Sequence, residues 1–274
     1  MDVILLFCTV AGAILVGAAL LASVLAPFDP DAQRLLARLR PSVGFERADP
    51  RHWLGTDQLG RDLLSRCLFG LQLTLALSFF GAVVGLVLGS GLGLLAGYAG
   101  GIVDDIVMGI VDVKIAMPFT LVALLVVALA GSTISVLILV LGLAYWAHFA
   151  RLVRAQVLAL RDLPYIEAAR AAGASNARIL MRHVVPNILS PVIVMFTLNL
   201  SHLILLESSL SFLGLGVQPP TASLGSMVGQ GRDYMASAPW VVVAPSLLII
   251  LVALVVMLLG DWLRDRLDVR LQER

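Results

Sequence analysis

The sequence has few charged residues and almost no lysine. Asp, Glu, Lys and Arg make up 14% of its 274 residues, whereas soluble domains carry roughly 25%. Hydrophobic residues make up 59%, and Lys114 is the only lysine. This composition excludes an ordinary soluble domain and predicts a protein that crosses a lipid bilayer several times. The net charge of +1 points to no charged partner, and we expect no binding to nucleic acid.

The signatures of several enzyme and metal-site classes are missing as well. The sequence contains no G-x-x-x-x-G-K-[ST] loop that would cradle phosphates, no H-E-x-x-H pair and no cysteine cluster. Its two cysteines, Cys8 and Cys67, lie in or beside apolar runs, where inert packing explains them better than a disulfide or a metal site. We therefore predict that the chain is not an enzyme and that it holds no metal and no cofactor of its own.

Six apolar stretches are long enough to cross about 30 Å of hydrocarbon as helices. Charges mark their ends, because an Asp, Lys or Arg at a helix centre costs about 2.5–3.5 kcal/mol. We expect the first stretch to be a span and not a signal peptide, because it is longer than the apolar core of a signal peptide and no Lys or Arg precedes it. Met117-Pro118 should kink the third. The expected spans are Val3–Ala26, Leu73–Ala96, Asp105–Leu129, Ile134–Ala150, His183–Leu206 and Trp240–Leu259.

The stretch 67–103 carries no charge and is long enough for one tilted helix or for a span with a re-entrant piece. Its glycines fall partly at a spacing of four, which lets neighbouring helices approach closely. This spacing favours helix packing over a pore-lining role. The glycines are Gly81, Gly85, Gly89, Gly91, Gly93 and Gly97.

The distribution of arginine predicts the orientation. The loop 151–187 is rich in arginine, and such loops face the cytoplasm. Six spans then place both termini in the cytoplasm. The segment 27–66 does not agree with this orientation. It carries seven arginines, yet six spans would place it outside the cytoplasm.

The polar stretch 161–187 predicts a small helical hairpin. Pro164 suits the first turn of a helix, and the run 167–172 has high helix propensity. Gly173 permits a sharp change of direction, and Ser175 is a suitable N-cap for a second helix over 176–183. Small alanine side chains would let the hairpin sit deep in a groove of a partner.

This stretch resembles the coupling motif of permease subunits of ABC importers. The motif has the form E-A-A-x-x-x-G followed by an aliphatic-Pro pair, although His183 stands where an aliphatic residue is usual. Segments 52–62, 97–101, 211–220, 231–234 and 260–265 are similar to the dipeptide/oligopeptide/nickel branch, most like the second permease of a pair. Lys114, Leu224 and Val269 depart from its pattern. The residues that match the motif are Glu167, Ala168, Ala169, Gly173 and Pro186.

The resemblance implies an all-α polytopic membrane protein with the type I ABC-importer transmembrane fold and about six transmembrane helices. It divides the chain into an N-terminal helix with an extracytoplasmic segment (1–70), a transmembrane domain (71–260) and a cytoplasmic tail (261–274). It places the chain in a bacterial inner membrane, paired with a homologous second permease. Two cytoplasmic ATPase subunits would carry ATP and Mg, and an extracytoplasmic binding protein would deliver the solute. Glu167 would contact an ATPase or cap the first helix of the hairpin.

The resemblance implies transport of peptides or of similar small solutes, and leaves nickel complexes, glutathione and opine-like compounds open. Asn199, His202 and Glu207 lie in the fifth span, where ionisable and polar groups are functional candidates. They line the translocation path or bond to neighbouring helices, and both readings stay open. A secondary transporter working alone is the alternative class, but we find no inverted repeat. A membrane-embedded enzyme lacks any catalytic pattern.

Overall fold

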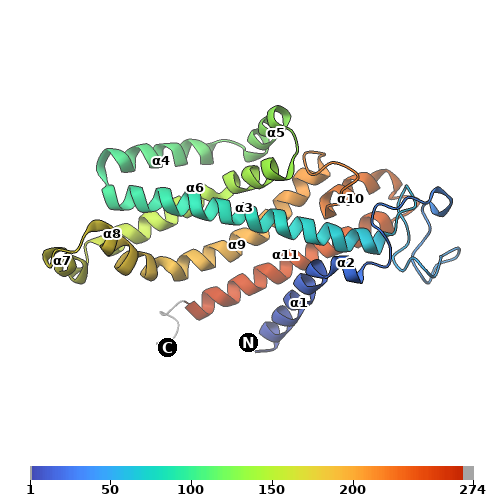
Figure 1. Ribbon diagram of the computed structural model, residues 1–274, viewed down its shortest axis with the longest axis horizontal. Coiled ribbons are helices and arrows are strands. Elements are labelled where there is room, and N and C mark those ends of the chain that lie inside the picture. Colours follow the sequence, from blue (N-terminus) through green and yellow to red (C-terminus); the bar gives the residue numbers. More distant parts are fainter. Residues whose placement is uncertain (1, 268–274) are drawn as a thin grey trace.

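The computed structural model describes residues 2–267, and nearly all of its regular structure is helical (Figure 1). Within that range the only β pairing is an isolated bridge between Thr56 and Asp62. Short 3₁₀ turns lie at Leu35–Ala37 and Arg232–Tyr234, and a π turn lies at Leu180–Val184. The helices are α1 (Asp2–Leu20), α2 (Ala22–Leu25), α3 (Leu63–Ala99), α4 (Gly101–Ala116), α5 (Phe119–Ala130), α6 (Ile134–Arg161), α7 (Pro164–Ala171), α8 (Asn176–Ile179), α9 (Val185–Phe212), α10 (Leu224–Gly231) and α11 (Trp240–Leu267).

Helices α3 and α6 form the closest pair in the structure. α3 is a single helix of 37 residues, about 55 Å long at 1.5 Å per residue, so the stretch 67–99 contains no re-entrant piece. Five of its six spaced glycines lie against α6, and Gly91 alone among them faces open space. A Cβ atom at Gly89 would lie 2.1 Å from the carbonyl oxygen of Trp146, and one at Gly93 would lie 2.5 Å from that of Ala150. The packing role predicted for the spaced glycines is confirmed.

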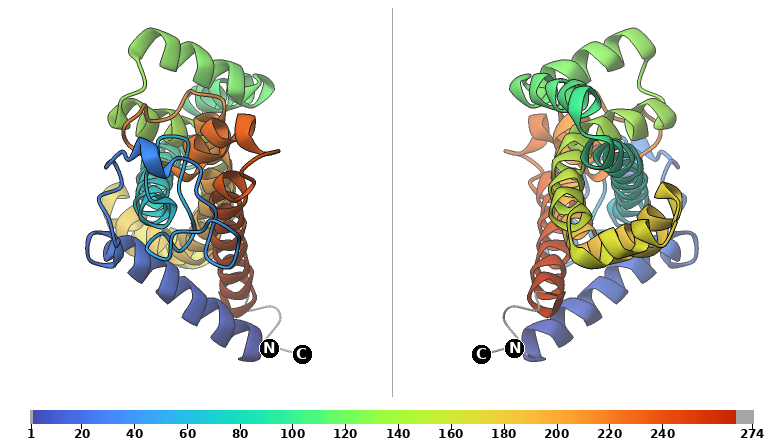
Figure 2. Two further views of the ribbon diagram at one scale, coloured as in Figure 1. Left: turned by 90° about the vertical axis from the view of Figure 1, so that its right-hand side faces the viewer. Right: turned by 90° about the vertical axis from the view of Figure 1, so that its left-hand side faces the viewer.

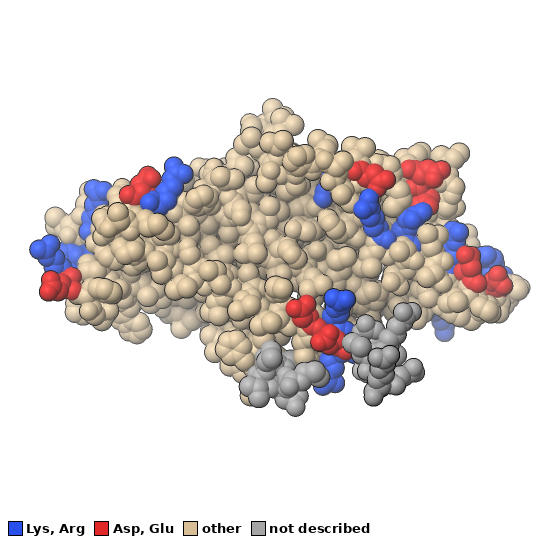
Figure 3. All heavy atoms as spheres, turned by 180° about the vertical axis from the view of Figure 1, so that it is seen from behind, with Lys and Arg blue, Asp and Glu red and all other residues tan. Residues whose placement is uncertain are grey.

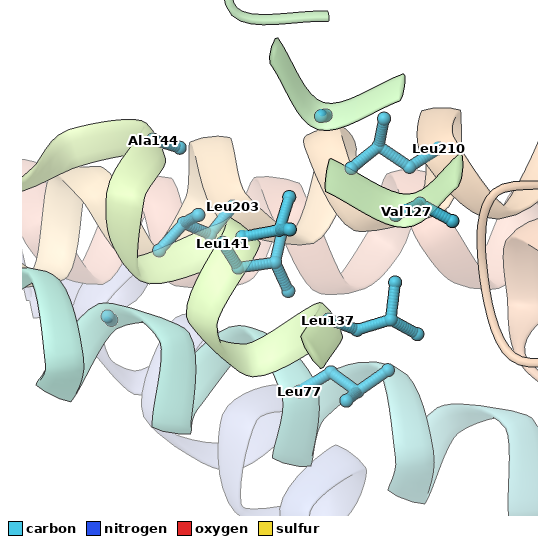
Figure 4. Packing of buried hydrophobic residues seen from close by; sticks show 10 residues of the cluster. Leu77, Val127, Leu137, Leu141, Ala144, Leu203 and Leu210 are labelled. Atoms are coloured by element: carbon cyan, nitrogen blue, oxygen red, sulfur yellow. The ribbon is translucent and has the colours of Figure 1, made fainter. Parts of the chain in front are cut away.

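Helices α9 and α11 complete the bundle. Leu77 of α3, Leu141 of α6 and Leu203 of α9 meet in one buried cluster, to which α5 adds Val127 (Figure 4). A second cluster joins α1, α3, α9 and α11. α1 and the pair α4–α5 lie on opposite sides of the central helices (Figure 2).

Four helices in the described range are long and apolar enough to cross a membrane: α3, α6, the continuous helix Asn176–Phe212, and α11. The predicted third span is not one straight helix, because α4 and α5 meet at an angle of 92°. The break falls at Met117-Pro118, the predicted kink. The first predicted span is a shorter apolar helix, Leu6–Leu20. The predicted order of six apolar segments is retained, with the first short and the third broken.

Several helices extend beyond the predicted segments, and two of these extensions have a visible cause. The helix of the fourth predicted span does not end at Ala150 but continues to Arg161, and its last turns carry arginines that pair with α4. The hairpin's second helix does not end at His183 but continues into α9 through the π turn. A proline ring clashes with the carbonyl of an ordinary α-helix, and the wider turn lets the helix pass through Pro186.

Charged side chains gather at the two ends of the long axis and beside the last turns of α11, and much of the surface between them is uncharged (Figure 3). One end carries α7 and α8, and we call it the hairpin end. The other carries the segment 27–62 and α10, and we call it the loop end (Figure 1). A hollow of about 520 Å³ is lined by Gln156 of α6, Ser190 of α9 and Arg264 of α11. The last turns of α11 therefore lie on the hairpin-end half of the molecule.

The loop end is held together by buried ion pairs. Arg61 Nε donates to Asp57 Oδ2 over 2.6 Å, and Arg66 Nε lies 3.5 Å from the same oxygen. Arg66 Nη1 also donates to the Pro30 carbonyl oxygen over 3.2 Å. All three charged side chains are at most 3% exposed. This network fixes the segment 27–62 on the first turn of α3.

A second buried pair caps α3 itself. His52 Nδ1 lies 2.8 Å from Asp62 Oδ1, and the other oxygen of Asp62 accepts from the backbone N–H of Ser65 over 2.8 Å. Asp62 is thus an N-cap whose orientation His52 fixes. The ring of Phe28 lies 4.7 Å from that of His52. The motif at 52–62 therefore has a structural role, which the sequence analysis did not predict.

Removing the carboxylate of Asp57 should destabilise the protein strongly. Asp57→Ala leaves the guanidinium groups of Arg61 and Arg66 buried without this counter-charge, which costs about 3–5 kcal/mol. We expect a marked fall in the unfolding temperature of the purified protein in detergent. Asp49→Ala is the control, because its partner Arg51 is 67% exposed and surface pairs contribute little. Equal losses in the two variants would contradict this account.

Candidate functional site

The hairpin at 163–179 has the shape that the sequence predicts. Pro164 stands in the first turn of α7. The helix ends in a Schellman arrangement, in which the N–H of Ala174 donates to the Ala169 carbonyl over 3.1 Å and that of Gly173 to the Arg170 carbonyl over 3.0 Å. Gly173 has φ of +82°, a left-handed conformation that glycine adopts at least cost. Ser175 then caps α8.

Apolar side chains anchor the hairpin to the bundle. Ile166 of α7 and Ile179 of α8 are fully buried and pack with Val153 and Val157 of α6. The hydroxyl of Tyr98, at the end of α3, lies 2.8 Å from the side-chain oxygen of Asn176. These contacts hold the hairpin at the hairpin end of α3 and α6. The sequence analysis did not single out the two isoleucines, although their burial follows from apolar positions in an otherwise polar hairpin.

Most residues of the coupling motif are exposed on the surface of the chain. Glu167, Ala168, Gly173 and Pro186 are exposed, and Ala169 is half-buried. Within the described part of the chain, no hydrogen bond or ion pair involves the Glu167 carboxylate, so it does not cap α7. Of the two roles expected for Glu167, contact with a partner is the one that the structure leaves available.

Arginines in the last turns of α6 are bound within the chain. Arg154 forms a two-pronged pair with Asp104 of α4, each N···O distance being 2.5 Å. Arg151 pairs with Asp112 of the same helix. Arg161 Nη1 donates to the Gly97 carbonyl over 3.0 Å. These side chains join α6 to α3 and α4, while the arginines of the hairpin itself remain exposed: Arg170, Arg178 and Arg182.

The structure does not bring the three predicted path residues onto one surface. Glu207 is 3% exposed, and Ser211 Oγ donates to its Oε1 over 2.6 Å. Asn199 is 5% exposed, and its amide nitrogen has no hydrogen-bond partner among the described residues. His202, by contrast, is exposed. Of the three, only His202 has an exposed side chain.

His202 has polar neighbours that the sequence analysis did not group with it. Its ring lies 6.1 Å from that of Tyr145 on α6, which in turn lies 5.4 Å from the ring of His148. Lys114 of α4 does not extend toward a membrane surface, since its ammonium group donates to the Ala144 carbonyl and lies 5.7 Å from the centre of the Phe119 ring. No sequence spacing could reveal this group, because its members come from three helices.

Known proteins resemble the chain over most of its length. Residues 89–273 match the family described as binding-protein-dependent transport system inner membrane component. A protein of Brucella suis biovar 1 (strain 1330), described as a candidate peptide transport system permease, is 42% identical over 265 residues, covering 95% of this chain and 87% of its own. The glutathione transport system permease protein GsiD of Pectobacterium atrosepticum is 42% identical over 259 residues, covering 94% and 84%.

Solved structures share the fold at lower identity. An inward-facing structure of the MetNI methionine ABC transporter superposes with a TM-score of 0.59 at 23% identity, covering 75% of this chain and 96% of the other. An amino acid ABC transporter crystallised with histidines gives a TM-score of 0.56 at 16% identity, covering 73% and 94%. With the family match and the 42% identical relatives, this fold leads to one conclusion: the chain belongs to the binding-protein-dependent transport system inner membrane components, the permease subunits of ABC importers.

Proposed function

We propose that this permease imports small peptides, glutathione among them, and that the hairpin at 163–179 couples their transport to ATP hydrolysis on partner subunits. The coupling role rests on the Glu167 carboxylate, which is exposed on an anchored hairpin and has no hydrogen bond or ion pair among residues 2–267. An exposed acid on a small alanine-rich surface suits a groove that offers hydrogen-bond donors.

The hairpin end faces the cytoplasm in this proposal, as the positive-inside rule predicts. Both termini then lie there too, since α11 ends toward the hairpin end and α1 runs antiparallel to it. Gly12 of α1, for example, lies against Leu259 and Val255 near the end of α11. The loop end would face the binding protein. The uncharged surface between the two ends has the character of a membrane-spanning region.

The partner set follows from what the chain lacks. It contains no phosphate-binding loop, so ATP and Mg would be held by two ATPase subunits. A homologous second permease would complete the path, and an extracytoplasmic binding protein would deliver the solute. The peptide and glutathione permeases among its relatives support the choice of solute.

Reconstitution tests the proposal. The chain, a second permease, two ATPases and an extracytoplasmic binding protein from the same organism are placed in liposomes, with tri-alanine and glutathione as probes. We expect uptake of at least one probe that requires ATP and the binding protein. Uptake by this chain alone, driven by an ion gradient, would instead assign it to the secondary transporters. Failure of the full assembly to take up either probe would contradict the proposed solute class.

A further inference from the structure

One face of the bundle carries an unusual group of basic and aromatic side chains. Tyr145, His148 and Arg151 follow one another at a spacing of three on α6, which places them on one side of the helix. Lys114 reaches the same helix from α4, and His202 approaches Tyr145 from α9. We call Lys114, His148, Arg151 and His202 the basic cluster.

The basic cluster is not part of the packed interior. His148, Arg151 and His202 are exposed and Lys114 is half-buried. The opposite side of α6 packs against the glycines of α3. The cluster therefore lies on the side of the bundle that α3 leaves free.

Contact with lipid tails does not suit this face. Ionisable side chains inside a membrane face a water-filled path or a protein partner, because hydrocarbon offers them no hydrogen bonds. Lys114 cannot be explained by extension to the membrane surface, since its ammonium group turns to the Ala144 carbonyl. Four such groups, carried by α4, α6 and α9, fit the wall of a translocation path.

The charges of the cluster are unbalanced. Arg151 is a permanent cation and Lys114 adds a basic amine, and within the described residues Asp112 is the only acid that pairs with any member, through Arg151. The ammonium group of Lys114 donates one of its three N–H groups to the Ala144 carbonyl. The guanidinium group of Arg151 also has N–H donors that Asp112 does not occupy. Two histidine rings add further nitrogen atoms. One negatively charged group would balance the remaining positive charge of the cluster and accept hydrogen bonds from its free donors.

We propose that the basic cluster is a contact site for the carboxylate of the transported solute. The inference rests on the proposed peptide function and names the chemical group that this face receives. Lys114 is the central contact, because its ammonium group lies between the carbonyl of Ala144 and the ring of Phe119, beside the open side of α6. Tyr145 and His202, whose rings lie 6.1 Å apart, would pack against the apolar part of the solute.

Substitution of Lys114 in the reconstituted transporter tests the site, with glutathione and tri-alanine as carboxylate-bearing probes. Lys114→Met removes a charge-assisted hydrogen bond, and we expect uptake to fall about tenfold or more. Lys114→Glu should fall further, and Lys114→Arg should remain near the wild-type rate. ATP hydrolysis stimulated by the loaded binding protein should be unchanged in all three variants. Val113→Met, at an exposed apolar neighbour on α4, is the control and should retain full uptake.

Several results would overturn the site. Wild-type uptake by Lys114→Met would remove Lys114 from the path. A parallel loss of ATP hydrolysis, or failure of the variant to assemble with the second permease, would show that Lys114 serves structure or subunit contact instead. Uptake of neither probe by the wild-type transporter would remove the peptide function and, with it, this inference. That case differs from the others because the unsubstituted protein already fails.

Discussion

Glu167→Ala should abolish most ATP-driven uptake without unfolding the permease. The exposed carboxylate makes no hydrogen bond or ion pair within the described chain, so its loss should remove only a contact with a partner. A hydrogen bond to a charged group contributes enough that its loss weakens ATPase binding by roughly 10- to 150-fold. We expect less ATPase to be recovered with the purified permease, and uptake to fall with it, while the unfolding temperature stays the same.

Glu46→Ala is the matched control, since Glu46 is an exposed glutamate at the loop end. It should retain the ATPase and full uptake. Wild-type recovery of the ATPase by Glu167→Ala would remove this carboxylate from the coupling contact. An equal loss in both variants would mean that surface charge in general, and not the hairpin, governs association.

Gly89→Leu should prevent the bundle from forming. A Cβ at this position would lie 2.1 Å from the Trp146 carbonyl oxygen and 2.7 Å from the Cβ atom of Phe149. Backbone atoms cannot move aside as a side chain can, so α3 and α6 would have to separate along their length. Overpacking of a core costs about 1–3 kcal/mol and occasionally more, and a backbone collision lies at the upper end. We expect little folded protein to be recovered from the membrane.

The same helix provides a control for this change. Gly91→Leu introduces the same side chain two residues away, where no atom lies within 4 Å of the new Cβ. Its yield and unfolding temperature should be close to those of the wild type. If Gly91→Leu were as damaging as Gly89→Leu, the loss would come from the larger side chain or from helix propensity, and the close packing of α3 against α6 would not explain it.

The parts of the structure that could be predicted from the sequence are those with local causes. Pro164, Gly173 and Ser175 define the hairpin through their own backbone preferences, and all three act as predicted. Met117-Pro118 marks the break between α4 and α5 because proline disrupts a helix wherever it stands. Apolar length located α3, α6, α9 and α11, since a membrane sets a minimum length for a crossing helix, whereas the first predicted span is short and the third is broken.

The parts that could not be predicted depend on contacts between distant segments. The end of α6 could not be predicted. In the sequence its arginines resemble those of a polar loop, and only the structure shows that two of them pair with Asp104 and Asp112 of α4. The buried network of Asp57, Arg61 and Arg66 resembled an ordinary polar loop. The basic cluster joins Lys114, His148 and His202 from three helices, and no spacing in one helix reveals such a group. Asn199 and Glu207 were singled out for their polarity, yet they lie inside the bundle.

Crosslinking from the two ends of the molecule tests the central claim most directly. A photoreactive residue at Ala168, on the exposed face of the hairpin, is compared with one at Leu36, which is 96% exposed at the loop end. In membranes that contain the whole transporter, irradiation should join position 168 to an ATPase subunit and should never join position 36 to it. An ATPase joined to position 36, or position 168 joined only to the binding protein, would contradict both the orientation and the coupling role of the hairpin.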